Sequence, residues 1–217
     1  MKTIKQEFIN WILLIIPIIY IAINWGKFPA QVPIHFNMDG EPNDYASKIV
    51  GLILLPGINI FTYILLLITP YIDPRKNNYA LFISKYTIIR TLLHLFLCEI
   101  ILLVCYYSLG NKINISVIST YSVIAMFLIL GNYLGNLRSN YFIGIRVPWT
   151  LESEEVWNLT HRFAGKLWVG ISIVALFAVY LLPPNKIILP TYIFAIAGLP
   201  IIYSYLKFKS INSSKIK

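Results

Sequence analysis

Four ionisable side chains near the N-terminus carry the nitrogen and oxygen atoms that metal ions use as ligands. They are His35, Asp39, Glu41 and Asp44. Their spacing fits no standard zinc pattern, and Asp39 and Asp44 are equally well explained by turn capping in a stretch that contains Asp-Gly and Glu-Pro-Asn-Asp. We therefore expect no metal here, and the sequence indicates no other cofactor.

A second ionisable group lies inside an apolar run. Arg90 and His94 are one helical turn apart, whereas Glu99 falls about 180° from Arg90. Ionisable residues within a bilayer are typical of proton and ion relays, so an ion-coupled transporter using Glu99, His94 and Arg90 is one candidate function. Against it, we find no inverted repeat and no matching pair of broken segments. Arg90 could instead reach the interface, and Glu99 could form a hydrogen bond that joins helices.

A third group combines Gly, Asn, Arg and Trp in residues 135–163. Thr150 or Ser153 is suited to be the N-cap of a helix that continues into the next apolar run. On that helix Trp157, His161 and Trp168 share one face, where Trp residues are also typical anchors at a membrane interface.

A membrane-embedded hydrolase could use a histidine with a nearby acid. However, the sequence has no HExxH or GxSxG motif and no Cys/His nucleophile pair. We therefore assign no catalytic role to His161 or His35 and do not expect the protein to be an enzyme.

The elements that must position these residues are long apolar segments. The chain has 217 residues, of which 58% are hydrophobic and 12% are charged. In soluble domains about 45–50% of the residues are apolar and about 25% are charged, so a soluble domain is excluded. A disordered chain is excluded as well, because disorder needs low hydrophobicity. Since one crossing needs about 20 apolar residues, there is room for six helices. The predicted spans are 8–25, 49–69, 86–109, 113–134, 164–182 and 187–206.

The cationic residues predict the orientation of these spans. Thirteen of the 18 Lys and Arg residues fall in one set of loops and termini, four fall in the other, and Arg90 lies within a span. The positive-inside rule then places both termini in the cytoplasm of a multi-pass cell-membrane protein. The net charge of +9 is therefore expected to face membrane lipid and not nucleic acid.

Only two loops are long enough to carry function in this all-α, polytopic design. Residues 26–48 form an outer loop, whose turn signals predict a folded cap. Residues 135–163 form a cytoplasmic loop that leads into a helix. No linker or repeat divides the chain, so we predict a single six-span membrane domain over residues 1–217.

Both loops carry recognisable patterns. Residues 140–162 read NYFIGIRVPWTLESEEVWNLTHR. This string resembles the signature of the SdpI-type immunity family, N-x-x-(I/L)-G-(I/L)-R-(T/V)-P-W-T-L-x-S-x-x-V-W-x-x-T-H-R, and Val147 takes the place of the more frequent Thr. The outer stretch PIHFNMDGEPN resembles the P-x-H-(F/W)-N-x-x-G-x-(P/A)-(D/N) module of the same family. With the six spans, the resemblance covers essentially the whole chain.

The resemblance implies a bacterial membrane immunity protein. Such proteins protect the producing cell from a secreted antimicrobial toxin peptide of the SdpC type, and some also sequester an ArsR-type transcriptional repressor at the membrane. The residues that the resemblance assigns to signalling or protection are Arg138, Asn140, Gly144, Arg146, Pro148, Trp149, Thr150, Trp157, His161 and Arg162 in the cytoplasmic loop. Those assigned to the toxin-facing side are Pro33, His35, Phe36, Asn37 and Gly40.

Overall fold

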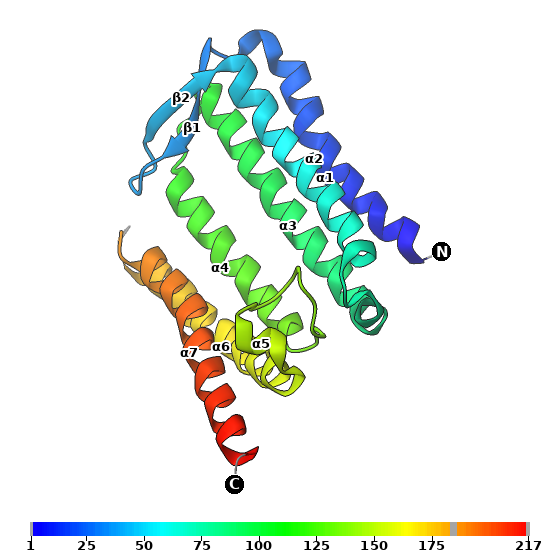
Figure 1. Ribbon diagram of the computed structural model, residues 1–217. Helices are drawn as coiled ribbons and strands as arrows, with labels where there is room; N and C mark the ends of the chain where they lie inside the picture. Colours follow the sequence, from blue (N-terminus) through cyan, green and yellow to red (C-terminus); the bar gives the residue numbers. More distant parts are fainter. Residues whose placement is uncertain (1, 183–185, 216–217) are drawn as a thin grey trace. The chain divides into compact units, whose positions relative to one another are not determined.

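The computed structural model describes residues 2–182 and 186–215. Met1, residues 183–185 and residues 216–217 lie outside the described residues, among them the terminal Lys217 that contributes to the charge bias. Figure 1 shows the elements along the chain. The helices are α1 (Lys2–Asn24), α2 (Lys48–Ile72), α3 (Tyr79–Ser108), α4 (Ile115–Leu134), α5 (Pro148–Glu152), α6 (Glu154–Leu181) and α7 (Ile188–Lys215), and the strands are β1 (Gln31–Phe36) and β2 (Pro42–Ser47).

Six of these helices, all except α5, are long and apolar enough to cross a membrane. The six predicted spans are therefore confirmed as helices. Their outer surfaces are rich in exposed large apolar side chains, such as Phe61, Tyr71 and Phe194 at 68%, 78% and 75% exposure. Apolar surface of this extent is unfavourable in water but fits a lipid environment.

Helices α1 and α3 begin before the predicted spans, and α1 starts at Lys2 where the span was expected to start at Phe8. Helix α3 begins at Tyr79, seven residues before the expected Tyr86, and is kinked at Phe82, whose φ of −137° is not helical. Tyr79 and Phe82 are buried and pack with Tyr86 in one aromatic cluster.

Of the two predicted N-caps, Ser153 is the one that α6 uses: the helix begins at Glu154, and the Oγ of Ser153 accepts from the backbone N–H of Val156 at 3.3 Å. Pro148 follows the extended Val147 and opens the short helix α5, where proline is favoured because it needs no hydrogen-bond partner for its nitrogen.

The all-α prediction omits a small sheet. Strands β1 and β2 pair antiparallel, with Val32 opposite Ala46 and His35 opposite Asp44. The turn between them is closed by Asn37, whose Oδ1 accepts from the backbone N–H groups of Asp39 and Glu41, both at 2.9 Å. The predicted outer cap is thus a β-hairpin, because the segments on either side of the turn at Asp39 and Gly40 pair as strands.

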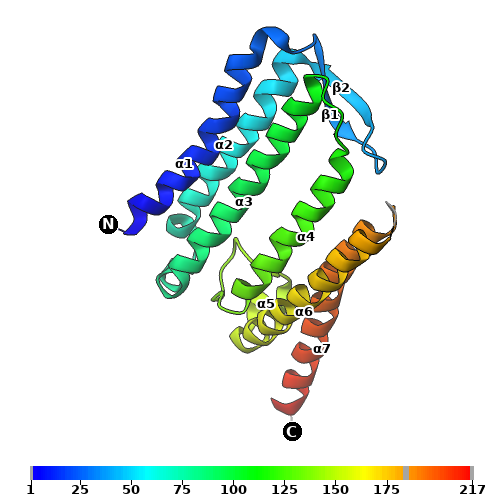
Figure 2. The same ribbon diagram turned by 180° about the vertical axis from the view of Figure 1, so that it is seen from behind.

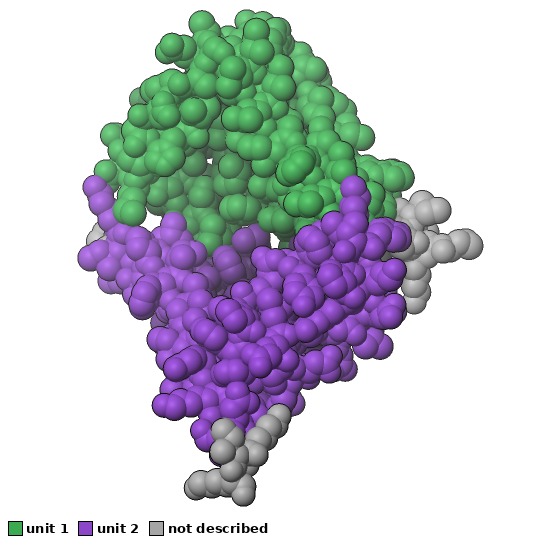
Figure 3. Space-filling model, in the orientation of Figure 1, with its two compact units in different colours: residues 1–67, 90–123 green, residues 68–89, 124–217 purple. Residues whose placement is uncertain are grey.

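The chain forms two compact units, coloured separately in Figure 3. Unit 1 comprises residues 1–67 and 90–123, and Figures 1 and 2 both show its hairpin at the end of the helices where α1 leads into α2. Unit 2 comprises residues 68–89 and 124–217, and in it α5 packs against α6 and α7. The buried core of unit 1 includes Ile21, Phe28, Val32, Leu52, Ile101 and Cys105, and that of unit 2 includes Tyr79, Phe82, Tyr86, Leu134, Leu137, Trp157 and Ala164.

Candidate functional site in residues 135–163

Residues 135–163, called the signature segment below, begin with a tight turn built around Asn140. This side chain is fully buried. Its Oδ1 accepts from the backbone N–H groups of Phe142 and Ile143 at 2.9 and 2.7 Å, and its Nδ2 donates to the carbonyl of Ile143 at 3.0 Å. An asparagine side chain commonly replaces a backbone partner in this way. Asn140 therefore shapes the segment and does not face a partner.

Gly144 follows this turn with φ +114°, a conformation that side chains with a Cβ rarely adopt. The position is also closed by neighbours from α6. A Cβ atom at Gly144 would overlap the imidazole of His161 and lie 3.1 Å from the ring of Trp157. Only glycine lets the loop backbone approach the two rings this closely.

His161 is fully buried and uses both ring nitrogens to hold backbone. The backbone N–H of Ile145 donates to Nε2 at 2.9 Å, so this nitrogen carries no proton. The proton is then on Nδ1, which donates to the carbonyl of Trp157 at 2.8 Å. The imidazole is a neutral connector between loop and helix, and neither nitrogen is left to act on a substrate.

Trp157 lies against His161, with ring centroids 4.0 Å apart and planes 23° apart. Its side chain is fully buried, and Nε1–H donates to the carbonyl of Leu137 at 2.8 Å. Trp168, on the same face of α6, donates to the carbonyl of Ile196 on α7 at 2.8 Å. The shared face was predicted correctly, but Trp157 packs in the protein core and is not an interface anchor.

Helix α5 is fixed from both sides. The Oγ1 of Thr150, fully buried, accepts from the backbone N–H of Val147 at 3.1 Å and donates to the carbonyl of Ile145 at 2.8 Å. Trp149 donates from Nε1 to the Oγ of Ser204 on α7 at 2.6 Å. These contacts attach the Pro-Trp-Thr part of the signature segment to the C-terminal helix.

The connection between α2 and α3 also holds the signature segment, and the sequence did not indicate it. Asp73, buried at 2% exposure, accepts from the backbone N–H of Tyr141 at 2.9 Å and from the hydroxyl of Tyr79 at 3.0 Å. Arg75 donates to the hydroxyl of Ser139 and, at 2.6 Å, to the carbonyl of Leu151. The sequence signal that could have indicated this contact is the single acidic residue Asp73, which ends an apolar run and precedes Pro-Arg.

The arginines of the signature segment are on its surface. Arg138, Arg146 and Arg162 are all exposed, and so is Pro148. Arg146 donates from Nη1 to the carbonyl of Tyr141 at 2.5 Å, which restrains its side chain without burying its charge. The segment thus divides into buried residues that build it and exposed cations that can meet a partner.

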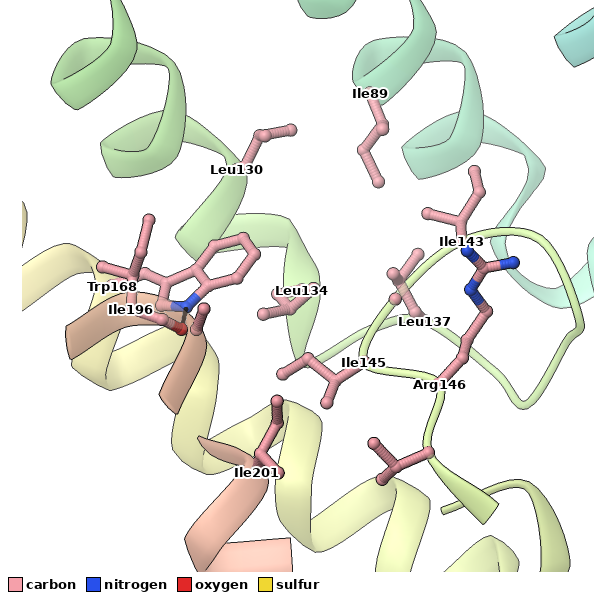
Figure 4. A pocket seen from close by; sticks show the side chains of 13 residues that line it. Ile89, Leu130, Leu134, Leu137, Ile143, Ile145, Arg146, Trp168, Ile196 and Ile201 are labelled. Carbon is pink, nitrogen blue, oxygen red and sulfur yellow. Dashed lines mark hydrogen bonds between the residues drawn. The ribbon is translucent and has the colours of Figure 1, made fainter. Parts of the chain in front are cut away.

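An apolar cavity of about 320 Å³ lies beneath the segment. Figure 4 shows Ile143, Ile145 and Arg146 on the loop side and Trp168 of α6 on another side. Isoleucine and leucine side chains from α3, α4 and α7 supply most of the remaining wall, among them Ile89, Leu130 and Ile201. The loop therefore forms one wall of a cavity within unit 2.

The hairpin module divides in the same way. Pro33 and Gly40 are buried, and Gly40 has φ +83° with a Cβ position only 2.6 Å from the Oδ1 of Asn114. Phe36 packs edge-on against Tyr107 with centroids 5.2 Å apart. His35 is exposed and its Nδ1 lies 2.6 Å from the Oδ1 of Asn43. Of the five predicted residues, therefore, only His35 has a largely accessible side chain.

The intramembrane residues have separate partners. Arg90, at 4% exposure, forms a two-pronged ion pair with Glu7, with both N–O distances 3.0 Å, so its charge is paired within the protein. Glu7 was not among the predicted residues, because it precedes the first apolar run and lies 83 positions from Arg90.

The other two residues of this group bond to different helices. Nδ1 of His94 lies 2.8 Å from Oδ1 of Asn59 on α2. Glu99 accepts from the Oγ of Ser122 on α4 at 2.5 Å. Ser122 was not anticipated as a partner. Within residues 2–182 and 186–215, no group of three or more His, Cys, Asp or Glu side chains is arranged to hold a metal ion.

Comparison with known proteins gives three findings. Residues 136–204 match the SdpI/YfhL protein family, and residues 12–60 match a domain of unknown function, DUF1648. The chain is 27% identical over 214 residues to "Immunity protein SdpI" of Bacillus subtilis (strain 168), covering 97% of this chain and 100% of that protein. No solved structure matches. The matched region therefore includes residues 136–163 of the signature segment, and the chain is similar along its full length to the Bacillus immunity protein.

Proposed function

We propose that the protein is a membrane immunity protein that protects its cell from a secreted toxin peptide. The observation that carries this proposal is the end-to-end similarity to a protein named as an immunity protein, which includes both loops and all six apolar helices. Both termini are then cytoplasmic, as the charge bias favours. In this orientation the hairpin faces the outside and the signature segment faces the cytoplasm.

The hairpin is proposed to be the toxin-contacting surface. Residues 28–47 contain Asp39, Glu41 and Asp44 but no Lys or Arg. Exposed apolar side chains lie beside these acids, with Met38 and Tyr45 at 56% and 50% exposure. An acidic surface with apolar patches favours a cationic, partly apolar peptide through charge complementarity.

Complementation tests the proposal. A strain 168 derivative that lacks its own SdpI is given this chain and exposed to its secreted toxin, and we expect survival to be restored. Glu41→Lys reverses one exposed charge of the hairpin and should reduce survival. The matched control Glu155→Lys reverses an exposed charge on α6 and should leave survival unchanged. Unchanged killing, with the wild-type chain present in the membrane, would contradict the proposed function. Equal protection by both variants would contradict only the role of the hairpin.

Capture of an ArsR-type repressor is proposed for the signature segment. Arg138, Arg146 and Arg162 are exposed cations of this segment, which supports a contact with a soluble partner. We expect such a repressor, expressed with this chain, to be recovered in the membrane fraction and to be released by Arg146→Ala. A repressor that stays soluble beside the wild-type chain would contradict this proposal.

The ion-coupled transporter has weaker support. Arg90, His94 and Glu99 each bond to a different helix, namely α1, α2 and α4, which does not favour one relay. Glu99→Gln separates the two functions: transport would lose ion flux, whereas immunity would be retained.

A further inference from the structure

A groove of about 580 Å³ lies on unit 2 between α4 and α6, away from the apolar cavity described above. Glycines form much of its wall. A Cβ at Gly131 would lie 2.9 Å from the carbonyl oxygen of Gly165, and one at Gly165 would lie 2.7 Å from that of Gly131, so the two backbones touch at its floor. Gly170, further along α6, has no atom within 4 Å of its Cβ position. Glycine at 131 and 165 thus permits the close approach of the backbones, and the absence of a side chain at Gly170 leaves that end of the groove open.

One end of the groove is cationic. Arg162 and Lys166 both line it, are one turn apart on α6 and are exposed. Within the described part of the chain, neither side chain has a hydrogen-bond or ion-pair partner. Asn132 and Asn136, also four residues apart, line the facing wall. Two uncompensated positive charges beside amide groups are suited to bind a phosphate.

The other end of the groove is apolar. No charged residue follows Lys166 until Lys186, so Arg162 and Lys166 mark the level at which α6 enters hydrocarbon. The groove continues past Val169 to Gly170, about 6 Å further along the helix at 1.5 Å per residue. A ligand that fits must be anionic at one end and apolar at the other.

We propose that this groove binds the headgroup and upper acyl chain of an anionic glycerophospholipid. Arg162 and Lys166 would hold the phosphate, and the glycine-lined part would receive the start of an acyl chain. Basic pockets between membrane helices bind anionic headgroups in this manner. Charge complementarity favours an anionic lipid over a zwitterionic one, because the choline or ethanolamine cation would lie near two positive side chains.

Native mass spectrometry of the detergent-purified, delipidated full chain tests this proposal. The protein is mixed with equal amounts of phosphatidylglycerol and phosphatidylcholine. We expect one phosphatidylglycerol to be retained in preference, and Arg162→Gln with Lys166→Gln to weaken its binding by about 30-fold, from the attraction typical of two basic residues. The matched control, Lys76→Gln with Lys209→Gln, removes two exposed cations outside the groove and should keep the preference.

A second variant keeps the charges and fills the groove. Gly170→Leu should fold, because its side chain enters open space, and should also weaken the binding of phosphatidylglycerol. Equal retention of both lipids by the wild-type chain, or full preference in either groove variant, would overturn the proposal. So would displacement of the lipid by millimolar glycerol phosphate, because a headgroup alone would then be sufficient. None of these results depends on whether the protein confers immunity.

Discussion

The backbone N–H of Ile145 donates to Nε2 of His161 at 2.9 Å, across 16 positions of the chain. This bond joins the loop of the signature segment to the first turns of α6. Because Nδ1 of the same ring is bonded to the carbonyl of Trp157, one buried side chain fixes both the loop and the helix face on which it packs. A residue type that usually suggests catalysis thus has a structural position here.

Replacing His161 should destabilise the protein. His161→Ala would leave the Ile145 N–H without an acceptor and open a cavity beside Trp157, so we expect the free energy of unfolding to fall by about 2–4 kcal/mol. The measurement is denaturant titration of the purified protein in detergent. Arg138→Ala, on an exposed side chain of the same segment, should change it by less than about 0.5 kcal/mol. Equal stability of the wild type and His161→Ala would contradict the assigned contacts.

Gly144→Ala separates steric collision from backbone strain. The added Cβ would overlap the imidazole of His161 at a residue with φ +114°, so we expect a loss of about 2–4 kcal/mol. Gly110 also has a positive φ, +89°, but has open space around its Cβ position. Gly110→Ala should therefore cost only about 1 kcal/mol. If the two variants have the same midpoint of thermal unfolding, the close approach to His161 is not the cause.

The features that sequence predicted best are those encoded locally. Hydropathy over about 20 residues fixes where a helix can span lipid, and a serine before two glutamates predicts the start of α6 at Ser153. The turn signals around Asp39 predicted a folded outer cap, although not that its flanks pair as strands. Each of these depends on residues that are neighbours in the chain.

Pairings between distant residues could not be predicted in this way. Nothing in the local pattern connects Glu7 with Arg90, or Asp73 with Tyr141, which is 68 positions away. Residue type also does not reveal burial. Asn140 and His161 stand in the same string as Arg146, but the first two are buried and only the arginine is accessible.

The ion pair between Glu7 and Arg90 predicts a measurable coupling. Glu7 also accepts from the hydroxyl of Tyr63 at 2.9 Å, so its carboxylate joins α1 to α2 and α3. Glu7→Gln should lower the free energy of unfolding by about 2–3 kcal/mol, because it removes the carboxylate partner of a buried guanidinium. The exposed Glu155→Gln should have little effect. In a double-mutant cycle with Arg90→Leu, additive losses would show that the two residues do not interact.

Asp73→Ala should loosen the signature segment without removing any of its own residues. The carboxylate of Asp73 accepts from the backbone N–H of Tyr141, and trypsin sites at the exposed Arg138 and Arg146 flank that residue. Loss of this hydrogen bond and of the one from Tyr79 should raise local opening, and cleavage that follows opening should accelerate by about tenfold.

The matched control for this measurement is Glu152→Ala, which removes an exposed carboxylate within the signature segment and should leave the cleavage rate unchanged. The two variants differ in whether the lost carboxylate is buried and bonded to the loop. Faster cleavage in both would mean that negative charge near the arginines, and not the bond to Tyr141, limits access. Faster cleavage in Asp73→Ala alone would establish that the α2–α3 connection holds the signature segment closed.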